Sequence, residues 1–153
     1  MIVVSDTSAV TALLQVGRID LLRELYGEVF IPEAVRDELA RSHSSLPTFL
    51  RCEHVLNMPE VRRLLAEIDL GEAEAIVLAK ERHADVLLID DLDARRVAQR
   101  EGVPFIGLLG VLVQGKQAGR VSSVRNLTAE LERVADFRLS AEIKEIAFRK
   151  AGE

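Results

Sequence analysis

Two short apolar segments that each run into an aspartate constrain the fold of this chain more than any other feature. Residues 2–5 lead into Asp6, and residues 86–89 lead into Asp90. Continuous apolar runs of this length are typical of strands in a parallel sheet that is covered by helices on both faces. Ligands bind beyond the carboxyl ends of such strands, where the strand order reverses. We therefore expect the two aspartates to lie in one cleft.

Strand and helix patterns alternate along the rest of the chain, which favours an α/β fold with a mainly parallel sheet. Further strands are expected at 29–31 and 103–106, the latter at a sheet edge because Pro104 lacks an N–H donor. The expected architecture is a three-layer α/β/α sandwich around a central sheet of four or five strands. Helices are expected at 7–14, 19–25, from Pro32 to the loop at 42–47, and at 59–68, 71–82, 94–100, 111–117, 124–134 and 141–149.

Length and composition predict a single domain over residues 1–153, because 153 residues of which 48% are hydrophobic form one sizeable core. No linker or repeat is present, and no apolar run approaches the ~20 residues of a membrane span. The first residues lack the basic region of a signal peptide, so we expect a cytoplasmic protein. The only cysteine, Cys52, and the three histidines have no zinc-site spacing.

Two acids on expected helices, Glu38 and Glu72, could join Asp6 and Asp90. Glu38 lies at the border of an apolar stripe and could point into a cleft. Four clustered carboxylates repel one another unless a cation neutralises them. Carboxylate oxygens are the ligands that Mg²⁺ and Mn²⁺ prefer. The combination therefore predicts a metal site.

Each acid also has a structural interpretation. Asp6 could cap the helix that follows it, and Asp69 and Glu72 have the spacing of a capping box. The nearby acids Glu74 and Asp91 leave the identity of two ligands open, since either could replace its neighbour.

The net charge of −5 is unusual for a protein that approaches a polyanion, but without the four acids the remainder would be −1. Arg95, Arg96 and Arg100, on the helix after Asp90, could hold phosphates at the cleft rim or simply be solvated. Three further cations are weaker candidates for the same role: Lys116, Arg120 and Arg125. Aromatic residues make up only 4%, so no extended base-stacking surface is expected.

Four segments, at 4–8, 31–39, 71–76 and 88–91, resemble the successive acidic motifs of PIN-domain nucleases and occur in the family's order. The resemblance extends over residues 1–119. The Gly-Glu-Ala-Glu-Ala-Ile segment at 71–76 is similar to a branch of PIN proteins related to VapC-like toxins.

The resemblance implies an enzyme that binds Mg²⁺ or Mn²⁺ and cleaves single-stranded RNA as the toxin of a toxin–antitoxin pair. By motif position it implies Asp6, Glu38, Glu72 and Asp90 as catalytic residues and metal ligands, with Ser8 as a supporting hydroxyl. It also implies a small antitoxin protein as partner and a homodimer. The apolar stretch that includes Leu109, Val113 and Leu127 would offer a dimer surface, or would complete the core.

Other classes of protein fit the motifs less well. A receiver-like domain would have an acidic pair after the first strand, and an aspartyl phosphatase would have a second aspartate where Ser8 stands. A catalytically inactive PIN-fold module that binds RNA or protein remains the main alternative. Metal-dependent cleavage of RNA distinguishes it from the nuclease.

Overall fold

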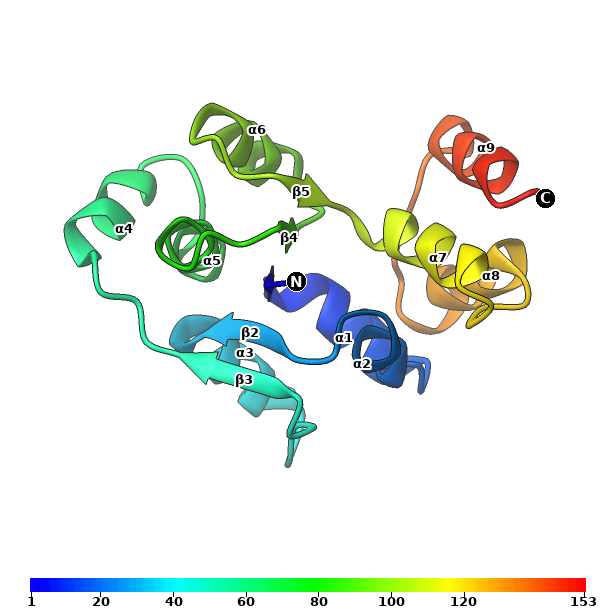
Figure 1. The fold of residues 1–153 in the computed structure, drawn as a ribbon, viewed down its shortest axis with the longest axis horizontal. Coiled ribbons are helices and arrows are strands. Elements are labelled where there is room, and N and C mark those ends of the chain that lie inside the picture. The colour runs from blue at the N-terminus through cyan, green and yellow to red at the C-terminus, as the bar shows by residue number, and fades with distance from the viewer.

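Five parallel strands form the central sheet of the computed structural model, which describes residues 1–153 (Figure 1). The strand order is β3-β2-β1-β4-β5, so the chain leaves the central strand β1 in one direction for β2 and β3 and in the other for β4 and β5. The expected α/β fold with a parallel sheet is therefore confirmed. The strands are β1 (Val3–Ser5), β2 (Val29–Pro32), β3 (Leu50–Glu53), β4 (Val86–Leu88) and β5 (Phe105–Ile106).

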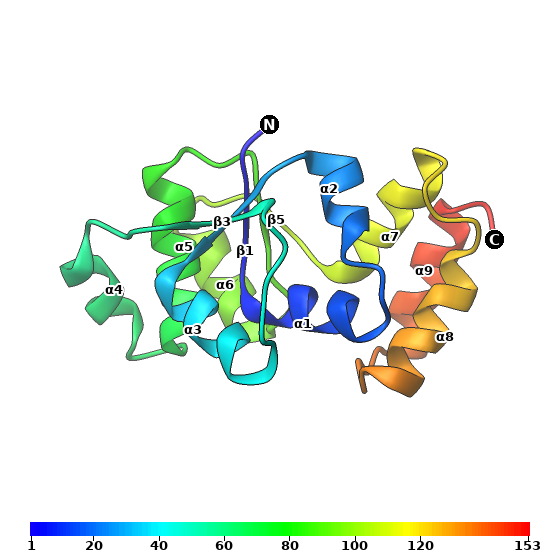
Figure 2. The same cartoon turned by 90° about the horizontal axis from the view of Figure 1, so that it is seen from below.

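Helices cover both faces of this sheet. Figure 2 shows α4, α5 and α6 on one side of β1, and α1, α2, α7, α8 and α9 on the other. The helices are α1 (Thr7–Gln15), α2 (Asp20–Tyr26), α3 (Glu33–Ser42), α4 (Met58–Leu64), α5 (Leu70–Glu81), α6 (Leu92–Arg100), α7 (Leu108–Gln117), α8 (Val124–Val134) and α9 (Ala141–Lys150). No helix is both long and apolar enough to cross a membrane.

The core is divided by the sheet into two apolar clusters. Successive side chains of β1 alternate between them, because neighbouring residues of a strand point to opposite faces. Val3 packs with α1, α2 and the C-terminal helices, whereas Val4 packs with α4, α5 and α6. Both faces of β1 are thus buried, as its uninterrupted apolar sequence predicts.

Strand β3 has no counterpart among the strands expected from the sequence. It lies at the sheet edge, pairs only with β2, and exposes Arg51 and Cys52, so it lacks the apolar run of a central strand. The helix expected at 59–68 ends at Leu64 and is followed by a turn at 65–67, and Asp69 then caps the next helix. Helix α7 begins at Leu108, three residues before the expected start.

The three residues considered for a dimer surface lie in the core of the single chain. Leu109 is 6% exposed, Val113 7% and Leu127 4%. They pack with α1, α2 and the other C-terminal helices. Of the two interpretations that the sequence left open for them, completion of the core is the one found.

Candidate metal centre

Asp6 and Asp90 follow the two strands that flank the point where the strand order reverses. In the parallel pairing of β1 with β4, Ser5 is opposite Leu88. The Asp6 backbone N–H donates to the Leu88 carbonyl at 3.1 Å, which extends this pairing by one residue. The two aspartates therefore follow neighbouring strands at the carboxyl end of the sheet, where ligands bind in open α/β folds.

Asp6 is a buried carboxylate without a hydrogen-bond partner for one of its oxygens. It is 3% exposed, and its Oδ1 atom is buried and unpartnered. It stands before α1, yet its side chain makes no capping hydrogen bond. Burial raises the Asp6 pKa well above its ordinary value, the charges of Asp90 and Glu72 raise it further, and the Ser8 backbone amide lowers it. An ionised Asp6 would be stabilised by a cation, because burial of an unpaired charge is costly.

Asp90, in contrast, is already held by two donors. The Leu108 N–H lies 3.2 Å from each of its carboxyl oxygens, and an Arg95 Nη2 lies 3.3 Å from Oδ1. Burial raises the Asp90 pKa, while Leu108 and Arg95 lower it. Gly107 makes room for this arrangement, since a Cβ at that position would lie 2.7 Å from Asp90 Oδ1 and would overlap the Arg95 guanidinium.

Glu72 serves both as part of a helix cap and as a neighbour of Asp6. Its backbone N–H donates to Asp69 Oδ1 at 2.8 Å, and its Oε1 accepts from the Asp69 N–H at 3.2 Å, which completes the capping box. Burial is the main cause that raises the Glu72 pKa from 4.5 to about 7. The same side chain adds to the negative potential at Asp6.

Glu38 reaches the first turn of α5 from α3. A Cβ on Gly71 would lie 2.5 Å from Glu38 Oε1, so the glycine leaves the space that this carboxylate occupies. Glu38 therefore lies next to the helix turn that carries Glu72. Its role as a metal ligand stays a prediction.

Glu74 and Asp91 cap helices. Glu74 is 8% exposed, and its Oε1 accepts from the Ala34 N–H at 3.0 Å, in the first turn of α3. Asp91 accepts from the Ala94 N–H at 3.0 Å and caps α6. Glu74 and Asp91 thus have structural roles. Glu72 also has one, but the charges of Glu72 and Asp90, unlike those of Glu74 and Asp91, raise the Asp6 pKa.

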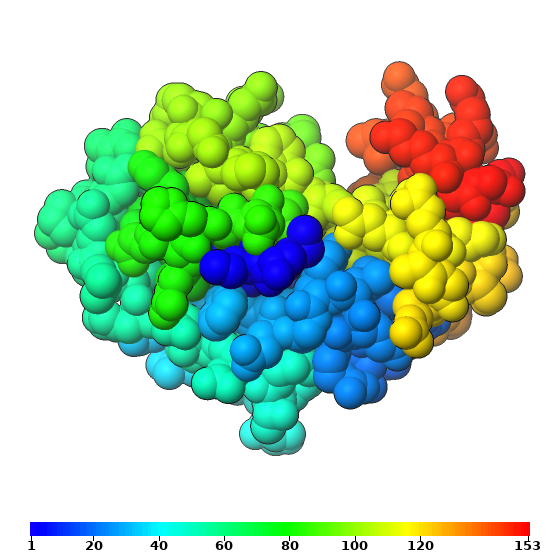
Figure 3. Space-filling model, in the orientation of Figure 1, coloured from blue at the N-terminus to red at the C-terminus, as the bar shows by residue number.

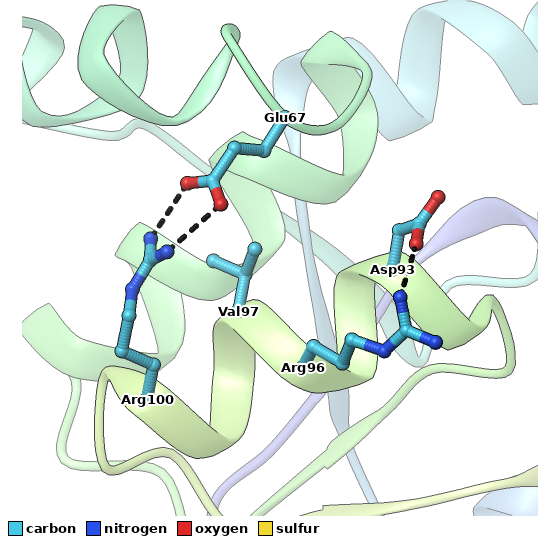
Figure 4. A pocket seen from close by; sticks show the side chains of 5 residues that line it. All are labelled: Glu67, Asp93, Arg96, Val97 and Arg100. Carbon is cyan, nitrogen blue, oxygen red and sulfur yellow. Dashed lines mark hydrogen bonds and ion pairs between the residues drawn. The ribbon is translucent and has the colours of Figure 1, made fainter.

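The arginines of α6 have unequal surroundings. Arg95 turns toward the sheet, where its Nε donates to the Ile89 carbonyl at 2.9 Å and its guanidinium lies 5.6 Å from the centre of the Phe105 ring. Arg96 and Arg100 instead border a shallow pocket of about 330 Å³ (Figure 4). There they form ion pairs at 3.1 Å with Asp93 and at 2.8 Å with Glu67, respectively.

The role at the cleft rim stays a prediction for Arg96 and Arg100, each of which forms an ion pair with a carboxylate of the same chain. The ion pair between Arg95 and Asp90 was not predicted from the sequence. A cation five residues after a strand-end acid was its only local signal. Ser8, proposed as a supporting hydroxyl, is exposed in the first turn of α1.

The acids supply the carboxylate oxygens that Mg²⁺ and Mn²⁺ prefer, but they do not surround an ion position. No three acids, histidines or cysteines converge closely enough to enclose an ion. Mg²⁺ usually keeps several waters and takes only one or two protein carboxylates, so an open arrangement suits it. The unpartnered Asp6 oxygen and the negative charges around it fit such an ion.

The fold and these acids define an α/β protein with an acidic site at the point where its strand order reverses. A family model described as a PIN domain matches residues 2–153, and the chain therefore belongs to the PIN-domain family. PIN domains are generally nucleases, hydrolases that generally use divalent metal ions. No curated protein matches the chain significantly.

Proposed function

We propose that this PIN domain is a metal-dependent endoribonuclease that cleaves single-stranded RNA. The observation that carries the proposal is the buried Asp6 oxygen, which has no partner and lies among the negative charges of Glu72 and Asp90. A site of this kind stabilises bound cations. Helix capping does not explain the position of Asp6, because its side chain makes no capping hydrogen bond to α1.

The proposed chemistry assigns a different part to each acid. Asp6 would be the central ligand, since it alone offers a buried free oxygen. Glu72, whose pKa lies at about 7, could also accept a proton from an attacking water. Asp90 would contact the ion with the remaining lone pairs of its two oxygens, and Glu38 would complete the set from α3. When bound, a divalent ion would lower the pKa of that water and neutralise charge on the phosphate.

The direct test is degradation of mixed-sequence single-stranded RNA by purified protein with Mg²⁺ or Mn²⁺, compared with the same reaction in EDTA. Cleavage should require the ion and be lost in Asp90→Asn. A matched control is Asp93→Asn, because Asp93 lies three residues after Asp90, is exposed in the first turn of α6 and pairs with Arg96. Metal-independent cleavage, or equal rates for the two variants, would contradict the proposal. An intact protein that does not cleave would be an inactive PIN-fold module.

The toxin role is the finer part of the proposal and rests on the resemblance of residues 71–76 to VapC-like proteins. A small antitoxin would inhibit the site by placing an arginine or lysine among the four acids Asp6, Glu38, Glu72 and Asp90, where it would compete with the metal ion. Expression of the chain should arrest growth, and co-expression of a small protein from a neighbouring reading frame should restore it. If that neighbour neither binds nor inhibits, the toxin role fails while the nuclease role stands. Homodimerisation is proposed on the same resemblance and is testable by sedimentation.

A further inference from the structure

A large groove adjoins the acidic site. A groove of about 660 Å³ is lined by residues of α9, α7, β5 and the start of α6, and Asp90 and Arg95 are among them. Figure 3 shows the hollow between the yellow-green surface of α6 and β5 and the red surface of α9. We call it the α9 groove. Because Asp90 is itself a lining residue, the α9 groove and the acidic site share this side chain.

The charge of the α9 groove is opposite in sign to that of the whole chain. Three cations line it, Arg95, Arg138 and Lys150, against the single carboxylate of Asp90, whereas the chain carries a net charge of −5. Lys150 makes no hydrogen bond or ion pair within the protein, and Arg138 pairs only with the exposed Asp136. An unpaired ammonium on an acidic protein favours an anionic ligand at this place.

The walls of the groove are apolar, and part of that apolar surface is open to solvent. Half of the lining residues are hydrophobic. Leu92 on one side is 67% exposed, and Ile143 and Ile146 on α9 are 51% and 46% exposed. A ligand that matches both features has anionic groups for the cations and flat apolar groups for the aliphatic side chains. An unstacked single strand of nucleic acid has both, because its bases are free to contact side chains.

We propose that the α9 groove is a subsite for single-stranded RNA and binds the nucleotides on one side of the phosphate that is cut. The proposal rests on the nuclease function proposed above, since continuity with Asp90 is what favours RNA over another anionic polymer. Lys150 and Arg138 contact phosphates, and the exposed aliphatic residues of α9 contact bases. Arg95, held between Asp90 and the groove, contacts the phosphate nearest to the site.

The test measures binding of a fluorescent single-stranded RNA by anisotropy in EDTA, where the proposed nuclease cannot act. Lys150→Glu should weaken binding about tenfold, and Lys150→Gln should lower the slope of log affinity against log salt by about 1. Arg149→Glu is the matched control, because Arg149 is the exposed neighbour of Lys150 on α9 but does not line the groove. It should change affinity less than twofold. Ile146→Ala, at an exposed position, should weaken binding without affecting the salt slope.

Equal losses for Lys150→Glu and Arg149→Glu would overturn the subsite, because they would reflect net charge alone. The RNA subsite would also be overturned if Lys150→Glu bound RNA as wild type does but no longer bound a small acidic protein. The groove would then belong to that protein partner. The nuclease function and the RNA subsite can be refuted independently. Wild-type protein that binds RNA through Lys150 but never cleaves it would refute the nuclease and leave the groove supported, whereas cleavage with an unchanged KM in Lys150→Glu would refute the groove alone.

Discussion

The raised pKa of Glu72 predicts an unusual dependence of stability on pH in metal-free protein. Below about pH 4.5 the carboxyl is protonated in both the folded and the unfolded chain, so it contributes nothing to the difference between them. Between pH 4.5 and about 7 the folded protein keeps a proton that the unfolded chain has released. The free energy of unfolding therefore falls as pH rises through this window and stays lower above it.

The size of this effect follows from the shift. A rise of the Glu72 pKa from 4.5 to about 7 limits the loss in the free energy of unfolding to about 3 kcal/mol. Glu72 is only half-buried, so solvent screening reduces the expected loss to about 1–2 kcal/mol between pH 5 and pH 8. Glu72→Gln removes the titration but keeps the capping box, since glutamine also accepts from the Asp69 N–H.

The assay is urea unfolding in EDTA at pH 5 and pH 8 for wild type and Glu72→Gln. Between pH 5 and pH 8 the free energy of unfolding should fall by about 1–2 kcal/mol more for wild type than for Glu72→Gln. Glu67→Gln is the control, because the pKa of Glu67 is lowered by its ion pair with Arg100 and its titration lies below the window. Saturating Mn²⁺ should reverse the wild-type trend, because binding requires the ionised acid. Equal pH slopes for wild type and Glu72→Gln would refute the reasoning.

Three further substitutions separate structural from metal-binding roles. Asp6→Asn should abolish cleavage while leaving metal-free protein as stable to urea as wild type or more so, because it removes charge repulsion; loss of folding would instead indicate a structural role. Glu74→Ala should cost about 1–3 kcal/mol in urea unfolding, because the Ala34 N–H loses its acceptor, and an unchanged free energy would contradict that role. Gly71→Ala should displace Glu38, weakening Mn²⁺ binding by calorimetry without loss of stability; unchanged Mn²⁺ affinity would remove Glu38 from the ligands.

The elements that the sequence predicted well are those whose signal is local. β1 and β4 are buried on both faces and therefore read as apolar runs, and the capping box of α5 is visible in the spacing of Asp69 and Glu72. β3 was missed because an edge strand with solvent on one side needs no such run.

The parts of the site that were not predictable depend on partners distant in the chain. Glu74 bonds to a backbone N–H 40 residues away, so no local pattern distinguishes it from a metal ligand. The orientation of Arg95 depends on Phe105 and on the space at Gly107, both outside its helix. The sequence patterns indicated Asp90 and Glu72, whose charges raise the Asp6 pKa, but not the contact of Arg95 with Asp90.

The pairing of β1 with β4 also determines when the acidic site can form during synthesis. Asp6 and its neighbour Asp90 lie more than eighty positions apart in the sequence, and Asp90 is held by the Leu108 N–H, which follows later still. Contacts between such distant segments form only after the intervening chain is available. A nascent chain that has not yet released α7 from the ribosome therefore has no assembled site. Any hydrolytic activity of this domain therefore begins only after β1, β4 and the start of α7 have all been synthesised.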